Sequence, residues 1–214
     1  MRSKGQPLQA CAMFVLVRHG NTFEAGTLPR RIGARTDLPL TATGLAQARA
    51  LGMYFADSGI AFAQAFASPL IRTQQTAAEI LAQQESPPAL QCANFLREID
   101  HGPDEDQNED AVLKRIGSDA IGAWESRAVA PPGWILDREA RIAAWRALFS
   151  APPANGPTLL VTSNGAARFA LLADPALLEQ AASLATLKLP TGGYGVIVRC
   201  EDGSLKLKEW GARP

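Results

Sequence analysis

The stretch that decides the fold is Met13-Phe14-Val15-Leu16-Val17-Arg18-His19-Gly20. A continuous run of apolar, largely β-forming residues ends abruptly at an arginine and a histidine. Such a run is typical of a strand that is buried on both faces, as in a parallel sheet. Ligands of open α/β sheets collect beyond the carboxyl ends of the strands, so Arg18 and His19 are the first candidate site residues.

The rest of the chain alternates between strand-like and helix-like segments. A second apolar run at 158–162 is followed by Ser163-Asn164-Gly165. Ser68 and Pro69 have the residue types of a helix N-cap and first helical position. The segments predicted as helices are 41–58, 69–83, 166–173 and a shorter one from Pro175; those predicted as strands are 63–67, 88–93, and two around a hairpin turn at Asp202-Gly203. This order predicts a three-layer α/β/α sandwich with a mostly parallel central sheet.

The length of 214 residues suits one domain, 1–214. Within it, residues 106–157 carry no strand pattern and are predicted as a helical insertion. Three of the four tryptophans lie there, Trp124, Trp134 and Trp145. We expect these rings to pack a helical layer rather than to contact a ligand.

The composition excludes several classes of protein. Lys and Arg number 21, as do Asp and Glu, and this balance argues against a general nucleic-acid or anionic-membrane binder. The apolar stretch 10–17 is too short to span a membrane, so a cytoplasmic location is the default expectation. Cys11, Cys92 and Cys200 are far apart, which predicts reduced thiols in or near the core, with neither a disulfide nor a metal site. The oligomeric state is left open, a dimer included.

The polar residues that follow the predicted strands are of the types that bind phosphate. Arg72 lies on the helix that opens after Ser68, and a helix N-terminus offers N–H groups to an anion. The planar guanidinium of an arginine can bind two phosphate oxygens at once. Arg18 and Arg72 around His19 therefore predict a site for a small phosphorylated molecule.

Four ordered motifs extend this prediction: Leu-Val-Arg-His-Gly-Asn-Thr at 16–22, the segment 36–48, the segment 67–77, and Leu-Arg-Glu-Ile-Asp-His-Gly at 96–102. Together they resemble the histidine phosphatase superfamily, which includes cofactor-dependent phosphoglycerate mutases and many small phosphatases. The resemblance is strong over 13–105 and weaker over 158–200. It implies that His19 is the nucleophile, that Arg18 and Arg72 bind phosphate, and that Glu98 donates a proton, with Asp100 as a competitor for that task.

The resemblance also marks the loop after His19, where Asn21 and Arg35 are candidates for phosphate or substrate contact. One residue departs from the family pattern. A second histidine is expected before a glycine after the late strand, and this chain has Asn164 there, between Ser163 and Gly165. The amide of Asn164 can donate a hydrogen bond to phosphate but cannot carry charge. Ser163 and His101, the only other histidine, are further candidates for substrate contact.

With the roles that the resemblance implies, these residues predict a phosphomonoester hydrolase that works through a phosphohistidine at His19, needs no cofactor, and has a carboxylic acid of raised pKa as its proton donor. Asn164 keeps a second hypothesis open, a weakly active or non-catalytic protein that binds a phosphorylated ligand. A phosphoglycerate mutase is less favoured, because the acidic run at 104–110 would repel a bisphosphate at the mouth of the pocket. That run is predicted to be a solvated face.

Overall fold

The computed structural model describes residues 12–214, and within this range six strands form one sheet in the order β3-β2-β4-β1-β5-β6. The strands are β1 (Ala12–Arg18), β2 (Gln64–Ala67), β3 (Leu90–Cys92), β4 (Thr158–Thr162), β5 (Tyr194–Arg199) and β6 (Leu205–Ala212). β1, β2, β3 and β4 run parallel, and β5 and β6 are antiparallel additions at one edge. The predicted hairpin at Asp202-Gly203 is confirmed, and Gly203 supplies the positive φ of +81° that its turn requires.

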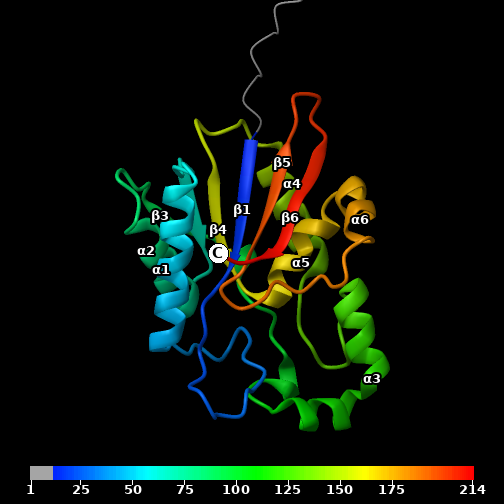
Figure 1. The fold of residues 1–214 in the computed structure, drawn as a ribbon. Helices are drawn as coiled ribbons and strands as arrows, with labels where there is room; N and C mark the ends of the chain where they lie inside the picture. Colours follow the sequence, from blue (N-terminus) through cyan, green and yellow to red (C-terminus); the bar gives the residue numbers. More distant parts are fainter. Residues whose placement is uncertain (1–11) are drawn as a thin grey trace, which may run out of the picture.

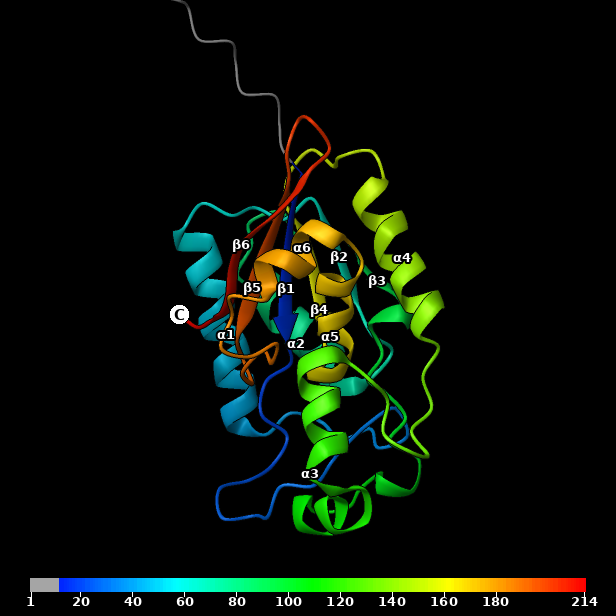
Figure 2. The ribbon, with the colours of Figure 1, turned by 90° about the vertical axis from the view of Figure 1, so that its right-hand side faces the viewer.

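Helices cover both faces of the sheet, as Figures 1 and 2 show. One face carries α1 (Ala42–Asp57) and α2 (Ile71–Leu81), and the other carries α4 (Arg138–Ser150), α5 (Asn164–Leu172) and α6 (Pro175–Ala181). Two single 3₁₀ turns, Asn94–Leu96 and Gly102–Asp104, precede α3 (Glu109–Arg127). α3 and the loop after His19 lie beyond the end of the sheet to which β1 points (Figure 1). The predicted α/β sandwich is therefore confirmed, with a mixed sheet.

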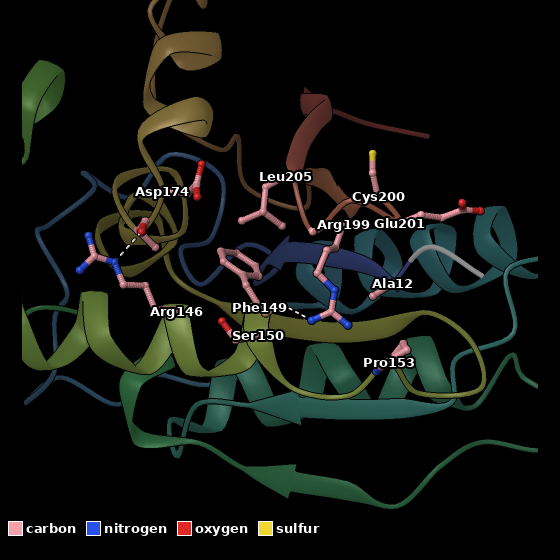
Figure 3. Close-up of a pocket in the computed structure, with 12 residues that line it drawn as sticks. Ala12, Arg146, Phe149, Ser150, Pro153, Asp174, Arg199, Cys200, Glu201 and Leu205 are labelled. Atoms are coloured by element: carbon pink, nitrogen blue, oxygen red, sulfur yellow. Dashed lines mark hydrogen bonds between the residues drawn. The ribbon is translucent and has the colours of Figure 1, made fainter. Parts of the chain in front are cut away.

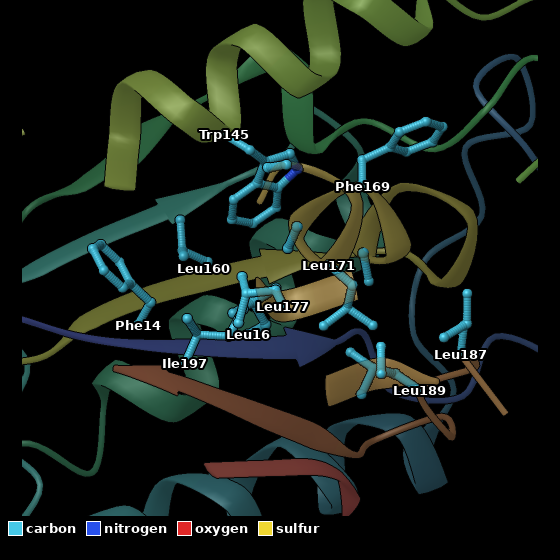
Figure 4. Packing of buried hydrophobic residues seen from close by; sticks show 14 of the residues in the cluster. Phe14, Leu16, Trp145, Leu160, Phe169, Leu171, Leu177, Leu187, Leu189 and Ile197 are labelled. Atoms are coloured by element: carbon cyan, nitrogen blue, oxygen red, sulfur yellow. The ribbon is translucent and has the colours of Figure 1, made fainter. Parts of the chain in front are cut away.

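Alternation along β1 divides the core into two halves. Phe14 and Leu16 face α4, α5 and α6, where they belong to one cluster with Trp145 and Phe169 (Figure 4). Val15, the residue between them, belongs to the opposite cluster with residues of α1 and α2. Each such fully buried side chain stabilises the fold by about 1.5–3 kcal/mol relative to exposure. The run that the sequence marks as a buried strand is thus packed on both faces.

The start of α2 differs from the sequence prediction. Ser68 is not its N-cap; the helix begins at Ile71 after Leu70, which has an extended backbone. The Ser68 hydroxyl is instead hydrogen-bonded to the Thr73 hydroxyl at 2.7 Å. The Ile71 N–H donates to the carboxylate of Asp37 at 2.8 Å, so a residue far away in the chain caps the first turn.

The acidic run at 104–110 is a solvated face, as predicted, only over 107–110, where every residue is exposed; its first residues differ. Asp104 is 1% exposed and accepts hydrogen bonds from the Trp134 indole, at 2.7 Å, and from Arg115. Glu105 is also buried, with 7% of its side chain exposed. The prediction is wrong for Asp104 and Glu105 because it counted charges without the arginine, the indole and the backbone N–H groups that these carboxylates meet in the fold.

Two further expectations concern the tryptophans and the cysteines. Trp124, Trp134 and Trp145 are buried in the core cluster, as expected, although Trp124 also borders the cavity next to His19. Cys92 is exposed and Cys200 is half-buried, so the expectation of core thiols is wrong for Cys92; Cys11 lies outside the described residues. In the described part of the chain, no helix is both long and apolar enough to cross a membrane.

Candidate active site

His19 follows the carboxyl end of β1 and is held on both ring nitrogens. Its Nδ1–H donates to the carbonyl of Gly20 at 2.8 Å, and Nε2 accepts from Nε of Arg72 at 3.2 Å. Burial lowers the pKa of His19 well below its ordinary value, and the positive charges of Arg72 and Arg18 lower it further. The imidazole is therefore neutral near pH 7, and the lone pair lies on Nε2.

Gly20 allows the loop after His19 to press against α1. Its N–H donates to the Thr76 hydroxyl at 3.1 Å, which ties the loop to α2. A Cβ at position 20 would lie 2.4 Å from the carbonyl oxygen of Gly44, a contact that no side chain tolerates. The residue after His19 thus has to be glycine for the imidazole ring to take this position.

Arg72 is fully buried behind His19, and its guanidinium is anchored by the loop at 33–36. It donates to the carbonyls of Thr36 at 2.8 Å and Gly33 at 3.1 Å. Glu105 holds this loop, because its Oε1 accepts from the Gly33 N–H at 2.9 Å and from the Thr36 N–H and hydroxyl at 2.9 and 2.8 Å. Glu105 therefore positions the predicted phosphate arginine, a role that no sequence signal indicated.

Arg18 and Asn164 are both hydrogen-bonded to the backbone of Leu189. Nη1 of Arg18 donates to the Leu189 carbonyl at 2.8 Å, and Oδ1 of Asn164 accepts the Leu189 N–H at 3.1 Å. Nε of Arg18 is buried without a hydrogen-bond partner in the part of the chain that the structure describes. Because the oxygen of Asn164 is engaged, its amide nitrogen is the end that is left to donate to a ligand.

Glu98 is 6% exposed and bridges to the start of α5. Its Oε2 accepts from the Gly165 N–H at 3.0 Å, and its Oε1 accepts from the Ile99 N–H at 2.9 Å. Burial raises the pKa of Glu98, but His101, these two N–H groups and Arg72 together hold it below the ordinary value. The raised pKa that was expected for a proton donor is therefore absent here.

A cavity of about 660 Å³ brings most of the predicted residues together. Six of the nine line it: Arg18, His19, Asn21, Glu98, His101 and Asn164. The side chain of Asn21 is turned back onto its own loop, donating to the Phe23 carbonyl at 2.7 Å. The volume is typical of a pocket for a small organic molecule and exceeds what a phosphate group alone needs.

The other three predicted residues do not line this cavity. Arg72 lies behind His19. Arg35 is largely exposed and pairs with Asp100 at 2.9 Å beside another cavity, of about 500 Å³, which Glu98 also borders but His19 does not. Ser163 is buried, and its hydroxyl has no hydrogen-bond partner among residues 12–214. Between the two candidate proton donors, the geometry thus favours Glu98, since Asp100 is committed to Arg35.

A second cavity, of about 530 Å³, lies at the opposite end of the sheet, near the start of β1 (Figure 3). Its two arginines already donate to backbone carbonyls, Arg146 to Ala173 at 2.7 Å and Arg199 to Ala151 at 2.7 Å. None of the predicted site residues borders it. The cavity at His19 is therefore the candidate active site. The residues from 12 onward contain no group of three or more His, Cys, Asp or Glu arranged to hold a metal ion.

Comparisons with known proteins agree with this site. Residues 14–213 match the family model of the histidine phosphatase superfamily, branch 1. A 2,3-bisphosphoglycerate-dependent phosphoglycerate mutase of Methylobacterium sp. (strain 4-46) is 34% identical over 158 residues, which is 72% of this chain and 75% of that protein. A counterpart from Rhizobium etli is 32% identical over 156 residues, 71% of this chain and 74% of the relative.

Solved structures show the same fold at lower identity. A mycobacterial glucosyl-3-phosphoglycerate phosphatase has a TM-score of 0.73 at 20% identity, with 94% of this chain and 99% of the other covered. A phosphoglycerate mutase from Bacillus anthracis str. Sterne has a TM-score of 0.74 at 22% identity, with 94% and 93% covered. Both phosphatases and mutases thus share this architecture.

Proposed function

Because the chain belongs to the histidine phosphatase superfamily, we propose that it hydrolyses a small phosphomonoester through a phosphohistidine at His19. The observation that carries the proposal is the state of the His19 ring. Its Nδ1–H is fixed on the Gly20 carbonyl, burial keeps the ring neutral, and the Nε2 lone pair meets the guanidinium of Arg72. A neutral imidazole beside fixed cations is a competent nucleophile for a phosphoryl group.

The reaction has two displacements. Nε2 of His19 attacks phosphorus, the bond to the leaving-group oxygen breaks, and the proton of Glu98 goes to that oxygen. Arg18, Arg72 and the amide of Asn164 bind the three non-bridging oxygens, and Arg72 exchanges its contact with Nε2 for a phosphoryl oxygen. A water molecule then attacks phosphorus, Glu98 takes its proton, and the N–P bond breaks to regenerate neutral His19. Positioning and charge stabilisation are the main contributions of the protein to such a transfer.

Glu98 has to be protonated for the first displacement, whereas its pKa is low in this structure. The substrate itself supplies the shift. A phosphate dianion beside the carboxylate is a like charge, which raises the pKa of the carboxyl group, while it also neutralises the effect of Arg72. Proton donation is thereby coupled to occupancy of the site.

A phosphoglycerate mutase is the second candidate, and the identity of 30% or more to several curated mutases favours it. The two activities differ in the acceptor of the phosphoryl group of His19, which is water in a hydrolase and a hydroxyl of a phosphoglycerate in a mutase. The acidic run at 104–110 was expected to repel a bisphosphate. Of its residues, Glu109 lines the cavity and is paired with Arg31, so this objection is weaker than the sequence suggested.

The test is to trap the intermediate. Wild-type protein is mixed with p-nitrophenyl phosphate, quenched in alkali, and examined by mass spectrometry for an acid-labile phosphate, while release of inorganic phosphate is followed in parallel. His19→Ala is expected to lose both signals. His101→Asn, which removes the only other histidine, is expected to retain a trapped phosphate on His19. Phosphate binding without turnover or a trapped intermediate would instead establish the non-catalytic alternative that Asn164 motivated.

A further inference from the structure

One charged group of the cavity wall is not used by the proposed reaction. Arg168, on α5, is fully buried and borders the cavity that contains His19 and Glu98. Its Nη1 donates to the carbonyl of Trp124, and its guanidinium lies over the Trp124 ring at 4.4 Å. Its Nε and Nη2 have no hydrogen-bond partner within residues 12–214. Buried donors without partners are rare in folded proteins, and each calls for an explanation such as a catalytic role or a bound water or ion.

A purely structural role accounts poorly for these free donors. Arg141 offers a comparison, because it is half-buried and also lies over an aromatic ring, that of Phe169, at 5.9 Å. Arg141 places its terminal nitrogens on backbone carbonyls, including those of Phe95 at 3.1 Å and Glu98 at 3.4 Å. Arg168 makes one such bond and leaves two nitrogens for another partner.

The other cations on this side of the cavity already have partners. Arg31 pairs with Glu109, and Lys188 pairs with Glu125. No carboxylate pairs with Arg168 in the described chain; the charges that act on it most strongly are those of Glu98, Glu125, Arg31 and Arg18. Burial lowers the pKa of Arg168 to about 10, so the side chain still carries its positive charge near pH 7. An uncompensated buried cation favours an anion beside it.

The place of Arg168 relative to the reaction indicates which part of a substrate it meets. Glu98, the proposed donor to the leaving group, accepts from the Gly165 N–H at the start of α5. Arg168 lies three residues after Gly165 and four after Asn164 in α5, so the three residues share one face of the helix. Arg168 is thus about one helical turn beyond Asn164, which is proposed to hold the transferred phosphoryl group, and an anion beside it belongs to another part of the ligand.

We propose that Arg168 forms a second anion subsite, so that the substrate is a phosphomonoester whose leaving group carries a carboxylate or a second phosphate. The inference rests on the proposed function and names its substrate class. The guanidinium offers Nε and Nη2 as a fork, which suits the two oxygens of either anion. The cavity of about 660 Å³ has room for such a leaving group next to the phosphate.

The test compares ligands that differ only in the second anion. Binding to the His19→Ala protein is measured by calorimetry, so that hydrolysis consumes no ligand. The first pair is 3-phosphoglycerate and glycerol 3-phosphate; the second is propane-1,3-diol bisphosphate and its monophosphate, and together they separate a carboxylate from a phosphate preference. We expect the member with the anionic tail in at least one pair to bind about ten-fold or more tightly than its partner, as for a charge-assisted hydrogen bond.

Arg168→Met, which fills the same space without charge, is expected to abolish this ratio and to leave the affinity of the neutral-tailed ligands within about two-fold. Arg146→Met, at the cavity on the opposite end of the sheet, is the matched control and keeps the ratio. An unchanged ratio in a folded Arg168→Met protein overturns the subsite. If Arg168→Met does not fold, the ligand pairs still test the subsite in the His19→Ala protein, which retains Arg168. Equal affinities for the two members of both pairs overturn the subsite there as well.

The two proposals fail in different ways. If every ligand binds and phosphate is released by wild type, but the second anion makes no difference, only the subsite is wrong. If no ligand binds at all, the phosphate pocket itself is wrong and the proposed function falls with the subsite. A role of Arg168 in stability alone would lower the midpoint of thermal unfolding in Arg168→Met without changing the ratio, and that result also overturns the subsite.

Discussion

The contact between Glu98 and the start of α5 leads to a sharp prediction for Gly165→Ala. A Cβ at this position would lie 2.2 Å from Oε1 of Glu98 and 2.9 Å from Cγ1 of Ile99. Since a Cβ essentially never comes within 3.0 Å of another heavy atom, the carboxylate has to retreat by about 0.8 Å or more. That shift breaks one of the two charge-assisted bonds that Glu98 accepts, from Gly165 at 3.0 Å and from Ile99 at 2.9 Å.

The magnitude follows from these bonds. Losing one hydrogen bond to a buried charged group costs about 1.5–3 kcal/mol, and the ordinary helix preference of alanine over glycine offsets about 1 kcal/mol. We therefore expect the free energy of unfolding of Gly165→Ala to fall by about 0.5–2 kcal/mol. A displacement of about 1 Å at the proton donor is expected to lower kcat about 100-fold on an alkyl phosphate. The loss should be smaller on p-nitrophenyl phosphate, whose leaving group needs no proton.

The assay combines urea unfolding with kcat on the two substrates. Gly122→Ala is the matched control: Gly122 lies in α3, and its added Cβ meets nothing within 4 Å. That variant should be as active as wild type and up to about 1 kcal/mol more stable. If Gly165→Ala behaved like Gly122→Ala in both measurements, the Glu98–Gly165 contact and the role of Glu98 built on it would be refuted.

Three further predictions test other parts of the site. Glu105→Ala removes the oxygen that accepts from the loop at 33–36, which anchors Arg72, so it should lower stability by about 2 kcal/mol and kcat/KM about ten-fold. The exposed Glu85→Ala should change neither, and equal behaviour of the two would contradict the anchoring role. Burial lowers the pKa of His19, so as pH falls the unfolded chain protonates this histidine before the folded protein does. The contribution of His19 to the free energy of unfolding is therefore complete above pH about 6.5 and declines below it. In an acid titration, the stability of His19→Ala should decline less than that of wild type. If the asparagine is a handicap, Asn164→His should raise kcat on a generic phosphomonoester by up to about 100-fold, because it puts a charged donor in place of a neutral one. A lower kcat in this variant would show that the site is built around the amide.

Much of the fold is readable from the sequence because its signals are local. The buried run before Arg18, the helix after Thr41 and the hairpin at Asp202-Gly203 each depend on residues within a few positions of one another. The unbroken apolar run of β1 suffices to predict burial on both faces, and parallel strands bring their carboxyl ends to one edge of the sheet. The grouping of Arg18, His19 and Asn164 at one edge follows from that rule alone.

Only the tertiary structure decided the contacts between residues that are far apart in the chain. Glu105 looks like part of a solvated acidic run until the loop at 33–36 brings its N–H groups to it. The choice of Glu98 over Asp100 depends on which carboxylate meets Arg35 and which meets the start of α5. The free donors of Arg168 exist only because α5 crosses Trp124 beside the cavity. Propensity and periodicity describe a residue's near neighbours, whereas burial of a charge and the partners that compensate it are properties of the assembled fold.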